Sequence, residues 1–78
     1  MVKFRISLRS LQDVQEFVSL ATCRAYRVLV GDDRHQVNGK SFMEMFCLNF
    51  SVPLTVSAEC GPEELDQFLQ DAHHLLVN

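Results

Sequence analysis

The chain has 78 residues, a formal net charge of −3 and 47% hydrophobic residues. This length fits a single domain over residues 1–78, and the apolar content argues against a disordered chain, which would be poor in apolar residues and highly charged. The Lys and Arg residues form no cluster along the sequence, so we expect no nucleic-acid binding through phosphate neutralisation.

The three cysteines, Cys23, Cys47 and Cys60, are odd in number and form no CxxC motif. A small secreted domain normally carries an even disulfide framework, so reduced, partly buried thiols in a cytoplasmic protein are the better interpretation. No apolar run approaches the ~20 residues that a membrane-spanning helix needs. Lys3 and Arg5 also interrupt the N-terminal apolar stretch that a signal peptide would require. We therefore expect a cytoplasmic protein that does not interact with a membrane.

The N-terminal third predicts a strand followed by a helix. Apolar and polar residues alternate over residues 2–9, which is typical of a strand with one buried face. Ser10 and Asp13 then have the spacing of a capping box. We predict a helix over Leu11–Thr22 that buries a stripe of five residues: Leu11, Val14, Phe17, Val18 and Ala21.

Two short strands and a second capping box are predicted next. Residues 26–30 are apolar and β-branched, a Gly-Asp-Asp turn follows, and residues 34–37 fit a weaker strand. Ser41 and Glu44 repeat the capping-box spacing, which predicts a short helix over residues 42–48.

The last third predicts a fourth strand and a final helix. Pro53 precedes an alternating run over residues 54–59, and a missing N–H is tolerated where a strand begins. Pro62, followed by two acids, marks a helix start. The buried stripe of this helix would comprise Leu65, Phe68, Leu69, Ala72 and Leu76. The fold class is therefore α+β in the order βαββαβα, with a four-stranded antiparallel sheet and three helices on one face.

The stretch after Ser41 is the most apolar part of the chain. A two-turn helix cannot turn every side chain inward, so we expect part of this group to pack in the core and part to be exposed. The group comprises Phe42, Met43, Met45, Phe46 and Phe50. Its exposed members would suit a protein partner or a second copy of the chain, since Met adapts readily to different surfaces.

The remaining chemistry-bearing residues predict neither catalysis nor a metal site. His73 and His74 are adjacent on the last helix and point roughly 100° apart, which makes them a poor chelating pair, and His35 belongs to no motif. No carboxylate pair, glycine-rich phosphate loop or nucleophile-base set is apparent. We expect a protein that is not an enzyme and that uses no cofactor.

The element order, together with Asn38-Gly39-Lys40-Ser41-Phe42-Met43 through Leu48 and Pro53-Leu54-Thr55-Val56, resembles the HPr family. These are histidine-containing phosphocarriers of the bacterial phosphoenolpyruvate:sugar phosphotransferase system. The likeness covers the whole chain in one register without gaps, and it implies an HPr-like open-faced β-sandwich.

The resemblance also implies a role for the second helix. In the family, the serine that matches Ser41 is phosphorylated by an ATP-dependent kinase in some bacterial lineages, and the residues after it dock partners. Ser41 is thus a candidate regulatory phosphorylation site, and Phe42, Met43 and Phe46 are candidate partner contacts. Ser41 also fits a plain helix cap, and the two roles are compatible. The implied partners are a serine kinase or a transcriptional regulator.

The phosphocarrier motif of the family, His-x-Arg-Pro-Ala, falls on residues 10–14 and is not retained. Ser10 occupies the histidine position, Gln12 the arginine position and Asp13 the proline position. A serine phosphate is a stable ester, whereas a carrier needs an imidazole that titrates near neutral pH. The resemblance therefore implies a non-catalytic regulator or adaptor in carbon catabolite control. An active carrier that uses another residue, and a domain that only forms homodimers, stay open as alternatives.

Overall fold

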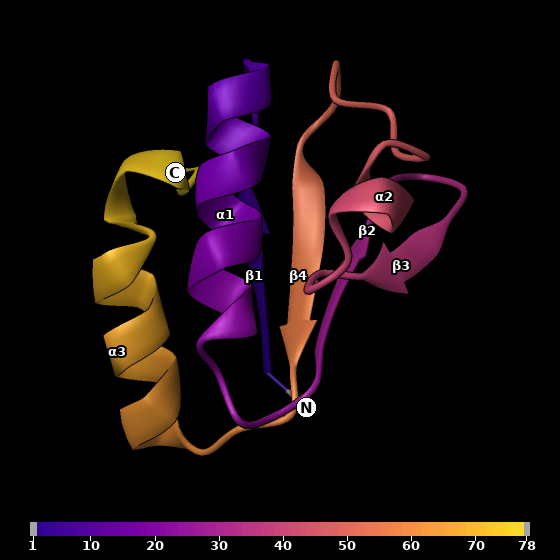
Figure 1. The fold of residues 1–78 in the computed structure, drawn as a ribbon. Coiled ribbons are helices and arrows are strands. Elements are labelled where there is room, and N and C mark those ends of the chain that lie inside the picture. The colour runs from indigo at the N-terminus through magenta and orange to yellow at the C-terminus, as the bar shows by residue number, and fades with distance from the viewer. Residues whose placement is uncertain (1, 78) are drawn as a thin grey trace.

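The computed structural model describes residues 2–77 and shows a sheet covered on one face by helices (Figure 1). The elements are β1 (Val2–Ile6), α1 (Leu11–Thr22), β2 (Val28–Gly31), β3 (Gln36–Asn38), α2 (Phe42–Met45), β4 (Leu54–Ala58), α3 (Pro62–Asp71) and a 3-10 turn, η1 (His73–Leu75). The predicted α+β class and element order are confirmed.

Within residues 2–77 the sheet has four strands in the order β1-β4-β2-β3, and all its neighbours are antiparallel. β4, which is late in the sequence, therefore lies in the centre between β1 and β2. The C-terminal segment covers the outer edge of β1, because Ser7 N donates to Leu75 O at 2.8 Å and Val77 N donates to Arg5 O at 3.1 Å. The short strand β3 forms the other edge.

The core lies between the sheet and the helices. Alternate residues of the central strands point into it, among them Val28, Val30, Leu54 and Val56, all fully buried. Phe68 of α3 is the aromatic centre: its ring lies 5.4 Å from Phe4, 6.0 Å from Phe17 and 6.3 Å from Tyr26. Because a side chain of this size buries 150–250 Å², Phe68 ties α3 to both α1 and the sheet.

The predicted bounds of α1 are confirmed, whereas the hairpin strands are shifted. β2 begins at Val28 instead of residue 26, and β3 begins at Gln36 instead of residue 34. The late start of β3 follows from the turn before it. The Asp32 carboxylate accepts hydrogen bonds from Arg34 N at 2.8 Å and His35 N at 2.7 Å, so these amides serve the turn and not a strand.

Both later helices end earlier than predicted. α2 ends at Met45 instead of residue 48, because the next amides bond three residues back: Cys47 N to Glu44 O at 3.0 Å and Leu48 N to Met45 O at 3.2 Å. α3 likewise tightens into η1, where Leu75 N donates to Ala72 O at 2.9 Å. This tightening places Leu75 in the core in place of the predicted Leu76, which is only partly buried.

No helix within residues 2–77 is long and apolar enough to cross a membrane. The cysteine thiols are free; Cys60 is partly buried, whereas Cys23 and Cys47 are exposed and not partly buried as predicted.

Candidate functional site

The first wall of the candidate site is the start of α1. Ser10 has an extended backbone, and its Oγ accepts a hydrogen bond from Asp13 N at 3.2 Å. The Asp13 carboxylate reaches back past Ser10 and accepts from Arg9 N at 3.0 Å. The predicted cap is therefore present, but the second hydrogen bond of the capping box goes to the amide of Arg9 instead of that of Ser10. Ser10 serves to begin the helix, and Asp13 adds a negative charge beside it.

The second wall is the segment that follows α2, and the position of α2 depends on Gly39. A Cβ at Gly39 would lie 3.0 Å from side-chain carbons of both Val28 and Val30, so a larger residue would have to displace these side chains, and glycine lets the chain pass close to β2. Ser41 then caps α2, with its Oγ accepting from Glu44 N at 3.3 Å. The Glu44 carboxylate accepts a hydrogen bond from Asn38 N at 3.4 Å. The second bond of this capping box therefore also goes to an amide before the cap residue, and not to that of Ser41.

An apolar groove runs between these two walls. It has a volume of about 350 Å³ and is lined by Leu8, Arg9, Ser10, Leu11, Val14, Phe46 and Phe50. Its walls thus come from the start of α1 and from the segment that follows α2. Ser10, which the resemblance aligns with the family's phosphohistidine, and the candidate contact Phe46 therefore line one depression.

Leu11 departs from the sequence prediction. It belongs to the expected buried stripe of α1 but is 55% exposed, whereas Val14, Phe17 and Ala21 are buried. At 100° per residue, Leu11 lies about 60° to the side of Val14, at the flank of the stripe. Its side chain therefore faces the groove and not the core, which the periodicity of the stripe alone did not reveal.

The apolar side chains of the α2 segment divide sharply between core and surface. Met45 is fully buried, whereas Met43 is 78% exposed and Phe46 is 49% exposed. Phe42 is partly buried and packs edge-on against Phe46, with ring centroids 4.8 Å apart. We call Leu11, Phe42, Met43 and Phe46, together with the groove, the apolar docking surface.

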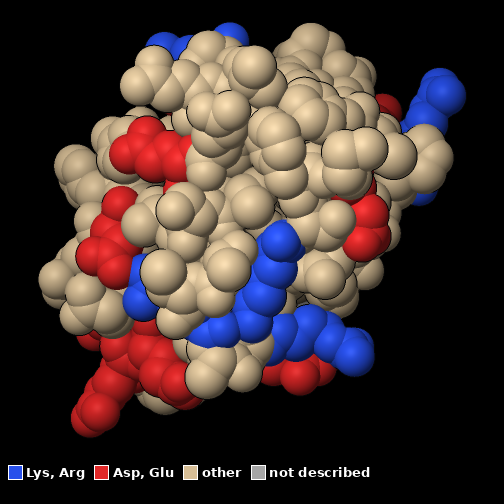
Figure 2. Space-filling view, in the orientation of Figure 1, with Lys and Arg blue, Asp and Glu red and all other residues tan. Residues whose placement is uncertain are grey.

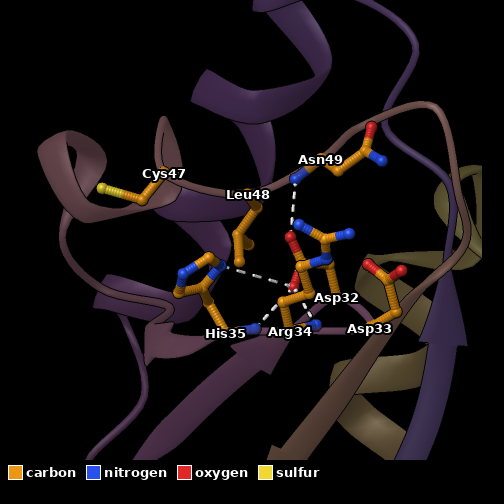
Figure 3. A pocket seen from close by; sticks show the side chains of 7 residues that line it. All are labelled: Asp32, Asp33, Arg34, His35, Cys47, Leu48 and Asn49. Carbon is orange, nitrogen blue, oxygen red and sulfur yellow. Dashed lines mark hydrogen bonds and ion pairs between the residues drawn. The ribbon is translucent and has the colours of Figure 1, made fainter.

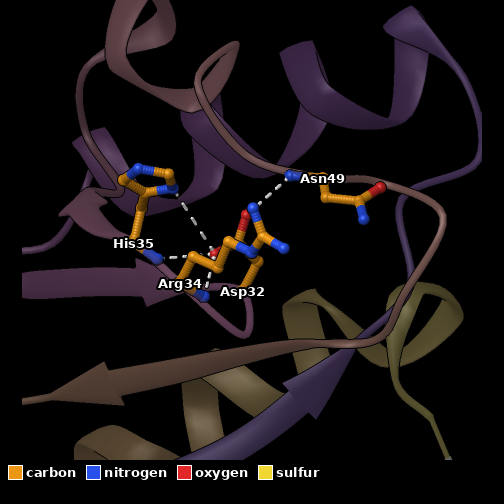
Figure 4. A network of polar contacts seen from close by, with 4 residues as sticks. All are labelled: Asp32, Arg34, His35 and Asn49. Carbon is orange, nitrogen blue, oxygen red and sulfur yellow. Dashed lines mark hydrogen bonds and ion pairs between the residues drawn. The ribbon is translucent and has the colours of Figure 1, made fainter.

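A single carboxylate, Asp32, fastens the segment after α2 to the β2–β3 turn (Figures 3 and 4). Its Oδ2 accepts from Asn49 N at 2.8 Å, in addition to the two turn amides that bond Oδ1. These three amide hydrogen bonds lower the pKa of Asp32 to about 2. Asp32 was predicted only as a turn residue, and its contact with Asn49, 17 positions away, carries no sequence signal.

The hollow beside Asp32 does not suit phosphoryl chemistry. It has a volume of about 430 Å³ and contains His35, Arg34 and Cys47 together with the carboxylates of Asp32 and Asp33 (Figure 3). His35 Nδ1 lies 3.9 Å from Asp32 Oδ1. Two carboxylates against one guanidinium would repel a phosphate dianion.

The other ionisable contacts are structural. His74 of η1 pairs with Glu16 of α1, with 2.7 Å between Nε2 and Oε1. Arg24 forms an ion pair with Asp71 and lies 4.9 Å over the Phe68 ring, and its hydrogen bond lowers the pKa of Asp71. No group of three or more His, Cys, Asp or Glu residues within the described chain could hold a metal ion.

Tyr26 and Lys40 have structural roles near the end of α1. Burial raises the pKa of Tyr26, whose hydroxyl lies among neighbours and has no hydrogen-bond partner within the described chain. Lys40 Nζ donates to Arg24 O at 2.6 Å, which fastens the segment before α2 to the end of α1. Neither residue faces the apolar docking surface.

Charge is absent from much of the face that carries α1 and α2. Figure 2 shows mostly uncharged surface over the upper middle of this view, where α1 begins and α2 lies, whereas acidic side chains gather over α3 at the lower left. A surface without charge at its centre and with exposed Leu, Met and Phe has the composition of a protein-binding patch.

The sequence matches no family model and no curated protein. The structure is similar to a crystal structure described as HPr-C-His from Thermoanaerobacter tengcongensis, with a TM-score of 0.75 and 26% sequence identity. The match covers 92% of this chain and 90% of that chain. The fold of this protein is therefore HPr-like, an open-faced sandwich of the type found in a phosphocarrier.

Proposed function

We propose that this protein is an HPr-family adaptor of the bacterial phosphotransferase system that has lost phosphocarrier chemistry and binds protein partners through the apolar docking surface. The observation that carries the proposal is the groove itself. At the place where the resemblance puts a phosphohistidine, the chain has a capped Ser10 beside an exposed Leu11, facing Phe46.

The chemistry at the start of α1 supports the loss of carrier activity. A carrier needs a nitrogen nucleophile that forms a labile phosphoramidate, and a cation that steadies the phosphoryl group. Here the hydroxyl of Ser10 accepts from the Asp13 amide, Gln12 is neutral, and Asp13 is an acid. A phosphate on Ser10 would be a stable ester next to a like charge.

The exposed side chains support the retention of docking. Leu11 and Phe46 line the groove, and the exposed Met43 lies three residues before Phe46. Aromatic and Met side chains are enriched in the cores of protein interfaces. The proposed partners are a serine kinase or a transcriptional regulator in the cytoplasm, where the free thiols of this chain would stay reduced.

Ser41 is the proposed regulatory position. A phosphate there would lie at a helix start, where backbone amides favour it, but its charge would oppose that of Glu44. Repulsion would displace the Glu44 carboxylate from Asn38 N and alter the surface directly before Phe42 and Met43. This gives a phosphorylation a physical route to partner binding.

Two phosphorylation assays with intact mass test the proposal. With the first enzyme of the system and phosphoenolpyruvate, we expect no acid-labile phosphate; one acid-labile phosphate per molecule would show that the protein is a carrier. With an HPr kinase and ATP, we expect a gain of about 80 Da, one phosphoryl group, that is absent from Ser41→Ala. No gain would leave Ser41 as a helix cap only.

Docking is tested by titrating the ¹⁵N-labelled protein with the same two enzymes. We expect amide shifts to change at Leu11 and Phe46, and the variant Phe46→Ser to weaken binding at least tenfold, as expected for an interface anchor. Val77→Ser is the matched control, since Val77 is exposed and apolar but lies at the edge of β1. An equal loss in both variants, or no binding to either enzyme, would contradict the docking role.

Sedimentation should show a monomer; a dimer that Phe46→Ser disrupts would support the homodimer alternative.

A further inference from the structure

We draw no further inference here: the strongest candidate, the hollow of about 430 Å³ between the β2–β3 turn and the segment after α2, which Cys47 lines together with His35 and Asp32, carries nothing, because the Cys47 side chain points away from the His35 imidazole (Figure 3) and the exposed cysteine therefore stands alone, with no second feature in residues 2–77 that points to a ligand.

Discussion

Two methionines of the α2 segment should respond in opposite ways to the same substitution. Met45 is fully buried between the helix layer and the sheet, whereas Met43, two positions earlier, is 78% exposed. Replacing a buried Met by Ala typically costs 2–5 kcal/mol, because the apolar contacts are lost and the cavity collapses only in part. We therefore expect Met45→Ala to lower the free energy of unfolding by about 3 kcal/mol, and Met43→Ala to change it by less than about 0.5 kcal/mol.

The expected difference is large for a chain of this length. At roughly 0.05–0.15 kcal/mol per residue, the total free energy of unfolding would be about 4–12 kcal/mol, so Met45→Ala would remove a substantial part of it. In a small domain, each kcal/mol moves Tm by about 4–8 °C. Urea denaturation followed by circular dichroism would measure both variants, with Met45→Leu as a control that keeps the volume and should cost less than about 1.5 kcal/mol.

The comparison also tests the docking surface, because a side chain cannot serve the core and a partner at once. Met43→Ala should retain stability and weaken binding of the kinase used above, whereas Met45→Ala should lose stability first. Similar losses of stability in the two variants would refute the division of α2 into a buried and an exposed side. So would a greater loss in Met43→Ala.

Two further predictions concern the polar contacts that frame the site. The pKa of Asp32 is lowered to about 2. The stability that its carboxylate contributes is therefore complete above the pKa of Asp in the unfolded chain, near 4, and is lost as pH falls toward 2. Asp32→Asn should be less stable at pH 7 and should lack this acid-dependent decrease; a wild-type-like pH profile of unfolding would contradict the role of the three amides. Ser10→Ala and Ser41→Ala should each cost about 1 kcal/mol as lost helix caps. In urea denaturation, a loss near zero for Ser10→Ala would mean that Ser10 is not needed as a cap, and would reopen the question of what else the residue does.

Sequence periodicity determined the layers of this protein. Capping residues and apolar spacing are local properties, so the bounds of α1, the starts of α2 and α3, and the α+β order followed from the chain alone. The inference that Ser10 stands where the phosphocarrier motif has its histidine also rests on the sequence alone, through the resemblance. Where helices ended, however, the sequence was a poor guide, because the last turn of α2 tightens to bury Leu48 and that of α3 to bury Leu75.

Tertiary structure alone decided which segments meet. Strand order and register place β4 at the centre and bring Lys3 beside Arg34, although 31 positions separate these two residues in the sequence. The groove likewise joins Leu11 to Phe46, and the exposure of Leu11 depends on what packs beside α1 and not on its spacing. Local patterns fix how a segment presents its faces, but contacts between distant segments arise from the packing of the whole chain. The apolar docking surface is of this second kind.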